Sequence, residues 1–415
     1  MQLSSDQEEA ISTILDWYNS SSRKPFITLG GYAGTGKTSV IAELRKRLPV
    51  SLRISYCAYT GKATSVLRNK LLKSKSLYKD DTIGTIHSLI YEPIMQGNEI
   101  VGWSRVSVLE CDLIVVDESS MVSQDIFEDL LSYGKPIICI GDHGQLPPIS
   151  SDDFNLMNNP DIKLEVVHRF DNSEDSALLK LSIMAREDGK IPYGEYGDGV
   201  LKVDPKSPKV ALFVKMMGDF HNSFCVCGKN DTRISLNKRF RNLFKRSEDN
   251  PVVGDRIICL KNNKRAIDLP IYNGMIGTIK TKYTYQNCYD ITCQFDNESE
   301  IYKGVISKKN FNNSNFFEQE TVFKNDVIRW RKQRSCGDYY SVNNNFVRSK
   351  EKITLDNFDY AYAITCHKSQ GSEMENVMVI EQKCYGWSTD DMWRRWLYTA
   401  ITRSRKHLII IGNEK

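Results

Sequence analysis

The chain contains 415 residues, of which 40% are hydrophobic and 26% are charged, and its net charge is +4. This composition is typical of a globular protein with two to four domains, and so small a net charge does not by itself indicate a nucleic-acid partner. We find no apolar run near the roughly 18 residues of a membrane span and no signal-peptide pattern at the start. Eleven cysteines without a C-x-x-C pair predict buried, reduced thiols, as in a cytosolic protein, and no zinc site.

The N-terminal segment predicts a helix, a strand and a second helix. A capping box, Ser5-x-x-Glu8, precedes apolar residues at helical spacing between positions 11 and 18. The apolar run at 26–29 indicates a short buried strand, and residues 38–44 are typical of a helix. Between strand and helix lies Gly31-Tyr32-Ala33-Gly34-Thr35-Gly36-Lys37-Thr38, which fits the pattern G-x-x-x-x-G-K-[ST].

A glycine loop between a strand and a helix N-terminus directs backbone N–H groups and the positive helix end at an anion. In such a loop Lys37 reaches the β- and γ-phosphates, and the hydroxyl of Thr38 can bind Mg²⁺. The sequence therefore predicts nucleotide binding at this loop. The residues predicted to bind the phosphates are Gly31, Gly34, Gly36, Lys37, Thr38 and Ser39.

Apolar runs at 52–58, 112–116 and 136–141 indicate parallel strands covered on both faces, so we predict one doubly wound α/β domain over residues 1–165. Within it, Gly97-Asn98 indicates a β-hairpin inserted at about 89–108.

Two acids, Asp117 and Glu118, follow the strand at 112–116. At this edge of the sheet Asp117 can hold Mg²⁺, and Glu118 can orient or deprotonate a water that attacks the γ-phosphate. An acidic pair after a strand also occurs by chance, but its position downstream of the loop favours the catalytic interpretation. A fixed turn at 141–148 follows the next strand and places Gln145 where its amide can hydrogen-bond the γ-phosphate or the water.

The second half is predicted to form another α/β domain from residues 166–254 and 351–415, with a small β-barrel inserted at 255–350. Its predicted elements are strands at 360–364, 377–380 and 408–411 and a helix at 390–404. The segment 233–246 carries six basic residues and no acid, and we interpret it as an amphipathic helix whose basic side is either a solvated face or a nucleic-acid contact.

Seven segments in this order resemble the motifs of superfamily 1 helicases of the 5′-to-3′ subfamily, the RecD-like group, and in size and layout the chain is most similar to small phage helicases. The matching positions are Gln7, 31–38, Asp117 with Glu118, 141–148 with Gln145, Arg169, 365–371, and 397–403 with Arg403. The resemblance implies two RecA-like domains, with Gln7 reading the adenine and Gln145 sensing the γ-phosphate. It also implies that Arg169 and Arg403 stabilise the transition state when the domains close. Tyr32 stands where relatives usually carry proline.

The resemblance further implies contacts to single-stranded DNA from both domains. Hydroxyl and basic groups at strand ends can bind phosphates, and an imidazole can stack on a base. The positions that match the family are Thr60, Lys62, Thr85, His87, Thr365, His367, Lys368 and Gln370. The hairpin at 89–108 matches the family's strand-separating pin in position, and Trp103 is either its wedge or a packed side chain.

From the resemblance we expect an ATP- and Mg²⁺-dependent helicase that moves 5′ to 3′ on single-stranded DNA and opens forked duplexes. An alternative is a DNA-stimulated ATPase that remodels or loads proteins on DNA without unwinding it. We expect a monomer in the cytoplasm of a host cell, serving phage replication or recombination, with a single-strand-binding or replication protein as a partner.

Overall fold

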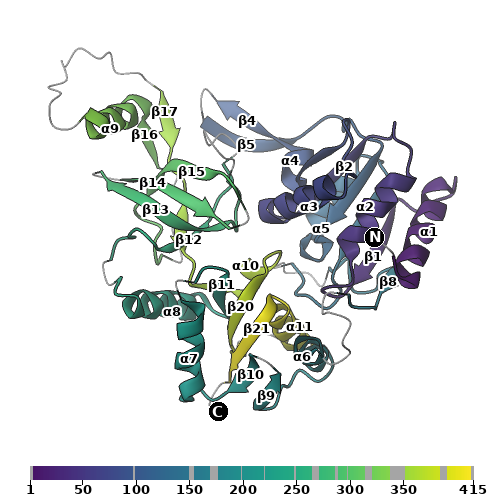
Figure 1. Ribbon diagram of the computed structural model, residues 1–415. Coiled ribbons are helices and arrows are strands. Elements are labelled where there is room, and N and C mark those ends of the chain that lie inside the picture. Colours follow the sequence, from purple (N-terminus) through teal and green to yellow (C-terminus); the bar gives the residue numbers. More distant parts are fainter. Residues whose placement is uncertain are drawn as a thin grey trace. The chain divides into compact units, whose positions relative to one another are not determined.

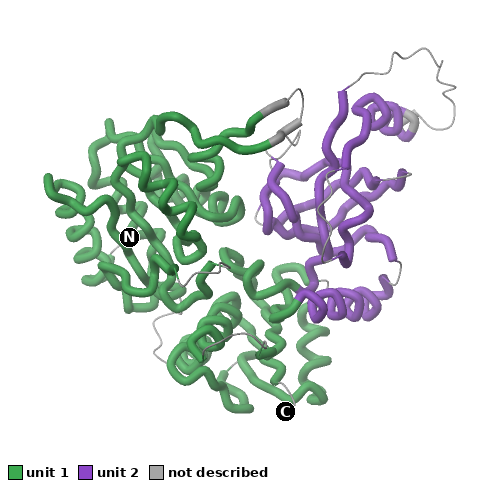
Figure 2. Tube along the Cα trace, turned by 180° about the vertical axis from the view of Figure 1, so that it is seen from behind, with its two compact units in different colours: residues 1–229, 364–415 green, residues 230–363 purple. Residues whose placement is uncertain are grey.

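The computed structural model describes residues 3–412 except for the segments 97–98, 149–153, 169–175, 198, 219, 247–248, 264–270, 286–287, 297, 314–319, 337–350 and 384–389. The chain forms two compact units, one of residues 1–229 with 364–415 and one of residues 230–363 (Figure 2). Among the described residues, no helix combines the length and the apolar character needed to cross a bilayer.

The first lobe of the larger unit is a six-stranded, fully parallel sheet (Figure 1). Its strands, in spatial order, are β3 (Thr82–Thr85), β2 (Ile54–Ala58), β6 (Leu113–Asp117), β7 (Ile137–Gly141), β1 (Phe26–Gly31) and β8 (Ile162–Leu164). Its helices are α1 (Ser5–Asn19), α2 (Lys37–Arg47), α3 (Gly61–Lys73), α4 (Ile86–Ile90) and α5 (Gln124–Leu131), with a 3₁₀ turn η1 (Ser119–Met121).

Alternating side chains of these strands feed two separate hydrophobic clusters, as expected for a sheet covered on both faces. In β6, Leu113 and Val115 pack with α1, α2 and α3, whereas Ile114 and Val116 pack with α4 and α5. The predicted α/β arrangement with a parallel sheet is therefore confirmed, and the phosphate loop lies at the carboxyl end of β1.

The inserted segment forms an antiparallel hairpin, with β4 (Tyr91–Gln96) paired to β5 (Glu99–Arg105). The turn residues 97–98 lie outside the described part of the chain. On β5, Trp103 lies opposite Pro93 and is 62% exposed.

The second lobe of the same unit is also a six-stranded sheet with helices (Figure 1). Its strands, in spatial order, are β19 (Ala363–Thr365), β11 (Ser223–Cys227), β20 (Met374–Ile380), β21 (Ser404–Ile411), β10 (Val200–Val203) and β9 (Gly194–Gly197). Its helices are α6 (Ala177–Glu187), α7 (Pro208–Met217), α10 (Cys366–Ser369) and α11 (Asp390–Ile401). Because β21 begins at Ser404, the helix predicted at 390–404 ends earlier than expected.

The smaller unit contains a five-stranded antiparallel sheet. Its strands, in spatial order, are β15 (Ile301–Ser307), β14 (Cys288–Phe295), β13 (Ile276–Thr284), β12 (Arg256–Cys259) and β18 (Phe358–Tyr360). A short ladder of β16 (Thr321–Phe323) and β17 (Lys352–Thr354) and the helices α8 (Asn230–Leu243) and α9 (Lys324–Cys336) complete the unit.

The single strand predicted at 360–364 is wrong. The chain leaves the sheet of the smaller unit after Tyr360 and enters β19 of the second lobe at Ala363. The side chain of Asn237 fixes this crossing, because it donates to the carbonyl of Tyr360 and accepts from the N–H of Ala363 at 2.8 Å. A run of apolar letters cannot reveal such a change of sheet.

The basic helix predicted at 233–246 is present as α8, which begins and ends three residues earlier, but its faces differ from the expectation. Arg233 and Arg241 are buried and pair with Asp359 and Asp255, whereas Leu243 is 65% exposed. Arg246 also pairs with Asp255, at 4.0 Å, so three of the six basic side chains contribute to the packing of the smaller unit, because buried charges persist only when paired and hydrogen-bonded.

Candidate nucleotide-binding and DNA-binding site

The phosphate loop has the backbone that its glycines allow. Gly34 and Gly36 have φ angles of +89° and +78°, a left-handed conformation that favours glycine. A Cβ on Gly31 would lie 2.5 Å from Oγ1 of Thr35, so the loop also closes on itself too tightly for a side chain there. Nζ of Lys37 lies over the loop and donates to the carbonyls of Gly31 and Tyr32 at 2.5 and 2.9 Å.

Gln7 lies directly beneath this loop, and it also corrects the predicted start of α1. The helix is capped by Ser4, so the third residue of the helix is Gln7 and not Glu8. Oε1 of Gln7 accepts from the N–H of Ser4 at 3.2 Å. Its Nε2 donates to the carbonyl of Thr35 at 3.0 Å. Gln7 is thus buried against the nucleotide loop, where the adenine-reading residue was expected.

The chain returns to the loop just before Arg169. The N–H of His168 donates to the carbonyl of Gly34 at 2.8 Å, and its imidazole lies 3.1 Å from Oγ of Ser4. Arg169 itself lies outside the described residues.

The two predicted acids stand at the carboxyl end of β6. Glu118 adopts a left-handed φ of +52°, and its N–H donates to the carboxylate of Asp117 at 2.9 Å. Burial raises the pKa of both carboxyls, and the charge of Asp117 raises that of Glu118 further, whereas Lys37 opposes both shifts. The phosphate-loop lysine therefore lies within electrostatic reach of both acids.

A lysine that the sequence did not single out, Lys70 of α3, joins this group. Its Nζ donates to Oγ1 of Thr38 at 3.1 Å, and its charge opposes the raised pKa of Asp117. A hydroxyl and a carboxylate that share one cation are oxygen donors of the kind Mg²⁺ binds, so Thr38 and Asp117 fit a Mg²⁺ site. No local pattern marks Lys70, because it reaches the site only through the packing of α3 on the sheet.

Gln145 lies in the turn after β7. Its Nε2 donates to the carboxylate of buried Asp142 at 3.1 Å, and its Oε1 is buried without a hydrogen-bond partner in the part of the chain that the structure describes. The second lobe holds this turn, because Arg395 donates to the carbonyls of His143 and Gln145 at 2.7 and 3.3 Å. The sequence did not indicate this role for Arg395.

Arg403 follows α11 and is buried. Its guanidinium donates to the carbonyls of Thr399 and Ser372 at 2.9 and 3.3 Å, so it is anchored to its own lobe. Its positive charge nevertheless lowers the pKa of Glu118 on the first lobe. Arg403 is therefore a second-lobe cation within electrostatic reach of Glu118.

One predicted DNA contact of the first lobe, Thr60, lies beside the second-lobe segment 365–371. Thr60 caps α3 by accepting from the N–H of Ala63 at 3.2 Å, and Lys62 lies in the first turn of that helix. From the other lobe comes Gly371, on which a Cβ would lie 3.8 Å from Oγ1 of Thr60. The segment 365–371 thus adjoins the start of α3.

The remaining first-lobe positions lie near the hairpin. Thr85 caps α4, and the exposed ring of His87 lies 6.1 Å from that of Tyr59 and 5.7 Å from that of Tyr91. Burial nevertheless lowers the pKa of His87, which favours its neutral form. The three rings form an aromatic surface at the base of β4.

The second-lobe positions differ in exposure. Thr365 and His367 are half-buried, Lys368 is exposed, and burial lowers the pKa of His367. Gln370 is buried, and its Nε2 donates to the carbonyl of Leu146 on the first lobe at 3.1 Å. The structure thus places Gln370 in the contact between the lobes.

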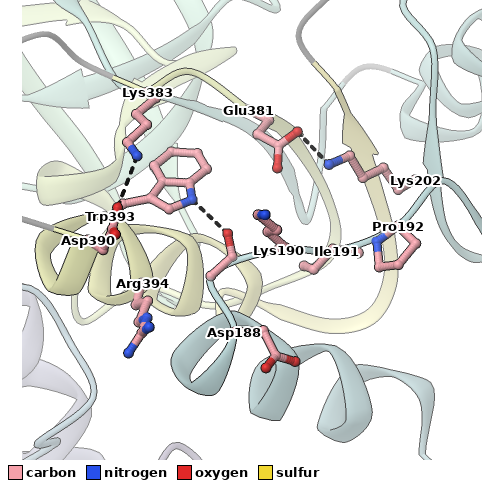
Figure 3. Close-up of a pocket in the computed structure, with 11 residues that line it drawn as sticks. Asp188, Lys190, Ile191, Pro192, Lys202, Glu381, Lys383, Asp390, Trp393 and Arg394 are labelled. Atoms are coloured by element: carbon pink, nitrogen blue, oxygen red, sulfur yellow. Dashed lines mark hydrogen bonds and ion pairs between the residues drawn. The ribbon is translucent and has the colours of Figure 1, made fainter.

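A pocket of about 560 Å³ lies elsewhere, at one edge of the second lobe (Figure 3). Its charged groups are mostly paired, with Lys202 on Glu381 at 2.6 Å and Lys383 on Asp390 at 3.2 Å. None of the predicted site residues lines it, so it is separate from the site described above.

The fold and the site together define a phosphate-loop nucleotide-binding protein with two α/β lobes. Residues 2–191 match the family model described as an AAA domain, and residues 360–411 match the UvrD-like helicase C-terminal domain.

Several of the relatives and structural neighbours are named as helicases. The chain is 26% identical to the RecBCD enzyme subunit RecD of Buchnera aphidicola, over 94% of this chain and 70% of that protein. It is 23% identical to the ATP-dependent RecD2 DNA helicase of Deinococcus radiodurans, over 93% of this chain but only 47% of the relative. Among solved structures, Pif1 helicase from Bacteroides in complex with ADP-AlF3 and ssDNA matches with a TM-score of 0.57 at 18% identity, over 100% of this chain and 93% of that one. The resemblance predicted from the motifs is therefore confirmed, and the matches support a DNA helicase.

Proposed function

We propose that this protein is an ATP- and Mg²⁺-dependent DNA helicase that moves 5′ to 3′ along single-stranded DNA and separates duplex. The observation that carries the proposal is one cluster: Lys37 lies over the phosphate loop, the N–H of Glu118 donates to Asp117, and the charge of Arg403 from the other lobe acts on Glu118. Phosphoryl transfer by such proteins uses a phosphate-binding loop, a pair of acids and an arginine from a second domain.

In this proposal, each residue has one task. The loop N–H groups and Lys37 bind the phosphates, while Thr38 and Asp117 hold Mg²⁺, which neutralises charge on the transferred group when bound. Glu118 orients the attacking water. Gln145 reports on that water by accepting from it with Oε1, which has no partner among the described residues, or on the γ-phosphate by donating from Nε2. Arg403, together with Arg169, stabilises the charge of the transition state.

We assign residues 1–165 to the first RecA-like domain and residues 166–254 with 351–415 to the second, of which 230–254 and 351–363 pack in the smaller unit. Because Arg403 belongs to the second domain, hydrolysis depends on how the two domains close, which links chemistry to movement along DNA. The polarity of movement follows from the resemblance to the 5′-to-3′ subfamily.

The DNA path in this proposal runs over the adjoining ends of α3 and the segment 365–371, and bases stack near His87. The hairpin of β4 and β5 acts as the strand-separating pin, with exposed Trp103 as its candidate wedge. We propose that residues 255–350, together with β18, form the inserted Src-homology-3-like barrel. We also propose that the protein acts as a monomer on forked DNA. In this proposal it serves phage replication or recombination with a single-strand-binding or replication protein.

The hairpin separates this proposal from a protein remodeller, which needs no wedge. Replacing residues 92–104 with two glycines should abolish unwinding of a forked duplex, while ATP hydrolysis stimulated by single-stranded DNA persists. The matched control is Trp103→Phe, which keeps an aromatic ring on the hairpin and should keep most of the unwinding. Full unwinding by the deletion variant would contradict the assignment of the pin.

A further inference from the structure

Two side chains of the second lobe reach the phosphate loop of the first, outside the roles assigned above. The N–H of Ala33 donates to the hydroxyl of Tyr398 on α11 at 2.9 Å, and this hydroxyl donates to the carboxylate of Asp142 at 2.9 Å. Tyr398 and Asp142 are buried, with 1% and 0% of their surfaces exposed. Because Asp142 also binds Gln145, one hydroxyl connects the phosphate loop to the proposed sensor of the γ-phosphate.

The neighbouring residue Tyr32 makes the second connection. The guanidinium carbon of Arg186 on α6 lies 3.8 Å from the centroid of the Tyr32 ring, a cation–π contact. The imidazole of His143 lies 4.1 Å from the same ring. There is no room between the two tyrosines for a larger turn residue, since a Cβ on Gly144 would lie 2.9 Å from Tyr398 and 3.3 Å from Tyr32.

Tyr398 and Lys37 bond to the same peptide group, the one that joins Tyr32 and Ala33. Nζ of Lys37 donates to the carbonyl of Tyr32, and the N–H of the same peptide, that of Ala33, donates to Tyr398. A lysine that turns to bind phosphate weakens its bond to that carbonyl. The position of the Tyr32–Ala33 peptide is therefore sensitive both to the nucleotide and to the second lobe.

We propose that Tyr398 and Arg186 are positioning residues that couple nucleotide binding at the phosphate loop to the placement of the second lobe, and hence to DNA binding. The inference rests on the proposed function, because it assumes that the segment 365–371 of the second lobe binds DNA. Coupling of this kind is reciprocal: DNA changes the affinity for nucleotide by the same factor as nucleotide changes the affinity for DNA.

The test measures the affinity of the 415-residue chain for fluorescent N-methylanthraniloyl-ADP with Mg²⁺, with and without saturating oligo-dT. The ratio of the two dissociation constants is the coupling factor. Tyr398→Phe keeps the packed ring and removes both hydrogen bonds. Arg186→Gln removes the cation that lies over Tyr32 and leaves the residues of the phosphate loop unchanged. We expect each to bring the factor closer to 1 by roughly fivefold, because Tyr398→Phe loses hydrogen bonds and Arg186→Gln loses a cation–π contact, and either loss is of that order.

The matched control is Tyr133→Phe, which removes a hydroxyl that donates to Ile90 and Val106 within the first lobe. It should leave the coupling factor unchanged, and thermal melting shows whether each variant is folded. A factor equal to that of the wild type in folded Tyr398→Phe and in Arg186→Gln would overturn the inference, as would a wild type whose nucleotide affinity does not respond to DNA. A wild type that binds no nucleotide would instead contradict the proposed function.

Discussion

Substitution of Gly36 by alanine tests how Gln7 and the phosphate loop fit together. An alanine at this position destabilises the fold in two separate ways. The left-handed φ of +78° costs a residue with a Cβ about 1–2 kcal/mol. The added Cβ would also lie 2.4 Å from Nε2 of Gln7, which is buried and cannot move without giving up its bonds to Thr35 and Ser4.

Two lost hydrogen bonds cost about 2 kcal/mol in total, so we expect Gly36→Ala to lower the free energy of unfolding by about 3–4 kcal/mol. Gly134→Ala is the matched control, because Gly134 has a φ of +63° but nothing lies within 4 Å of its Cβ position. This variant should lose only the backbone term of about 1–2 kcal/mol.

Urea unfolding of the full chain, with equal m-values verified, measures both losses. Gln7→Ala removes the side chain that the new Cβ would meet. In that background, Gly36→Ala should lower the free energy of unfolding only as much as Gly134→Ala does. The difference from its effect in the wild type is a coupling of about 2 kcal/mol between the two positions. If Gly36→Ala is no more destabilising than Gly134→Ala, or if the two substitutions are additive, the packing of Gln7 under the loop is refuted.

Three further outcomes follow from the same site and its surroundings. Lys37→Ala should leave the melting temperature nearly unchanged and abolish ATP hydrolysis, and normal turnover would contradict the phosphate-loop assignment. Arg403→Ala should lower the turnover number about 10³-fold or more at nearly constant nucleotide affinity, because it removes charge stabilisation of the transition state; a large loss of affinity at constant turnover would contradict that role. Hydrogen bonds from Arg53 lower the pKa of Asp112 to about 2, so this carboxylate stabilises the fold above its ordinary pKa near 4, and the contribution is lost as pH falls from about 4 to 2. Acid unfolding of Asp112→Asn should therefore show a smaller stability loss over that pH range than the wild type.

The sequence allowed prediction of those parts of the site that depend on local patterns. A strand, a glycine loop and a helix are contiguous at 26–47, so the loop could be placed before its geometry was known. Asp117 and Glu118 were found in the same way, since they directly follow a buried strand. The hairpin at 89–108 was predicted from its turn residues, and its two strands are present.

The parts that could not be predicted depend on contacts between distant segments. Lys70 meets Thr38 across 32 residues, and Tyr398 meets Ala33 across 365 residues. No spacing rule links such positions. Burial of paired charges is equally hidden, because Arg233 and Arg241 have the same sequence signature as exposed basic residues of a nucleic-acid-binding helix.

Unwinding of partial duplexes that carry either a 5′ or a 3′ single-stranded tail, with ATP and Mg²⁺ present, tests the central claim most directly. The account predicts that the protein opens only the 5′-tailed substrate and that Lys37→Ala opens neither. Opening of only the 3′-tailed duplex would contradict the proposed polarity. Failure to open either substrate, despite hydrolysis stimulated by DNA, would contradict the helicase itself and favour a remodelling ATPase.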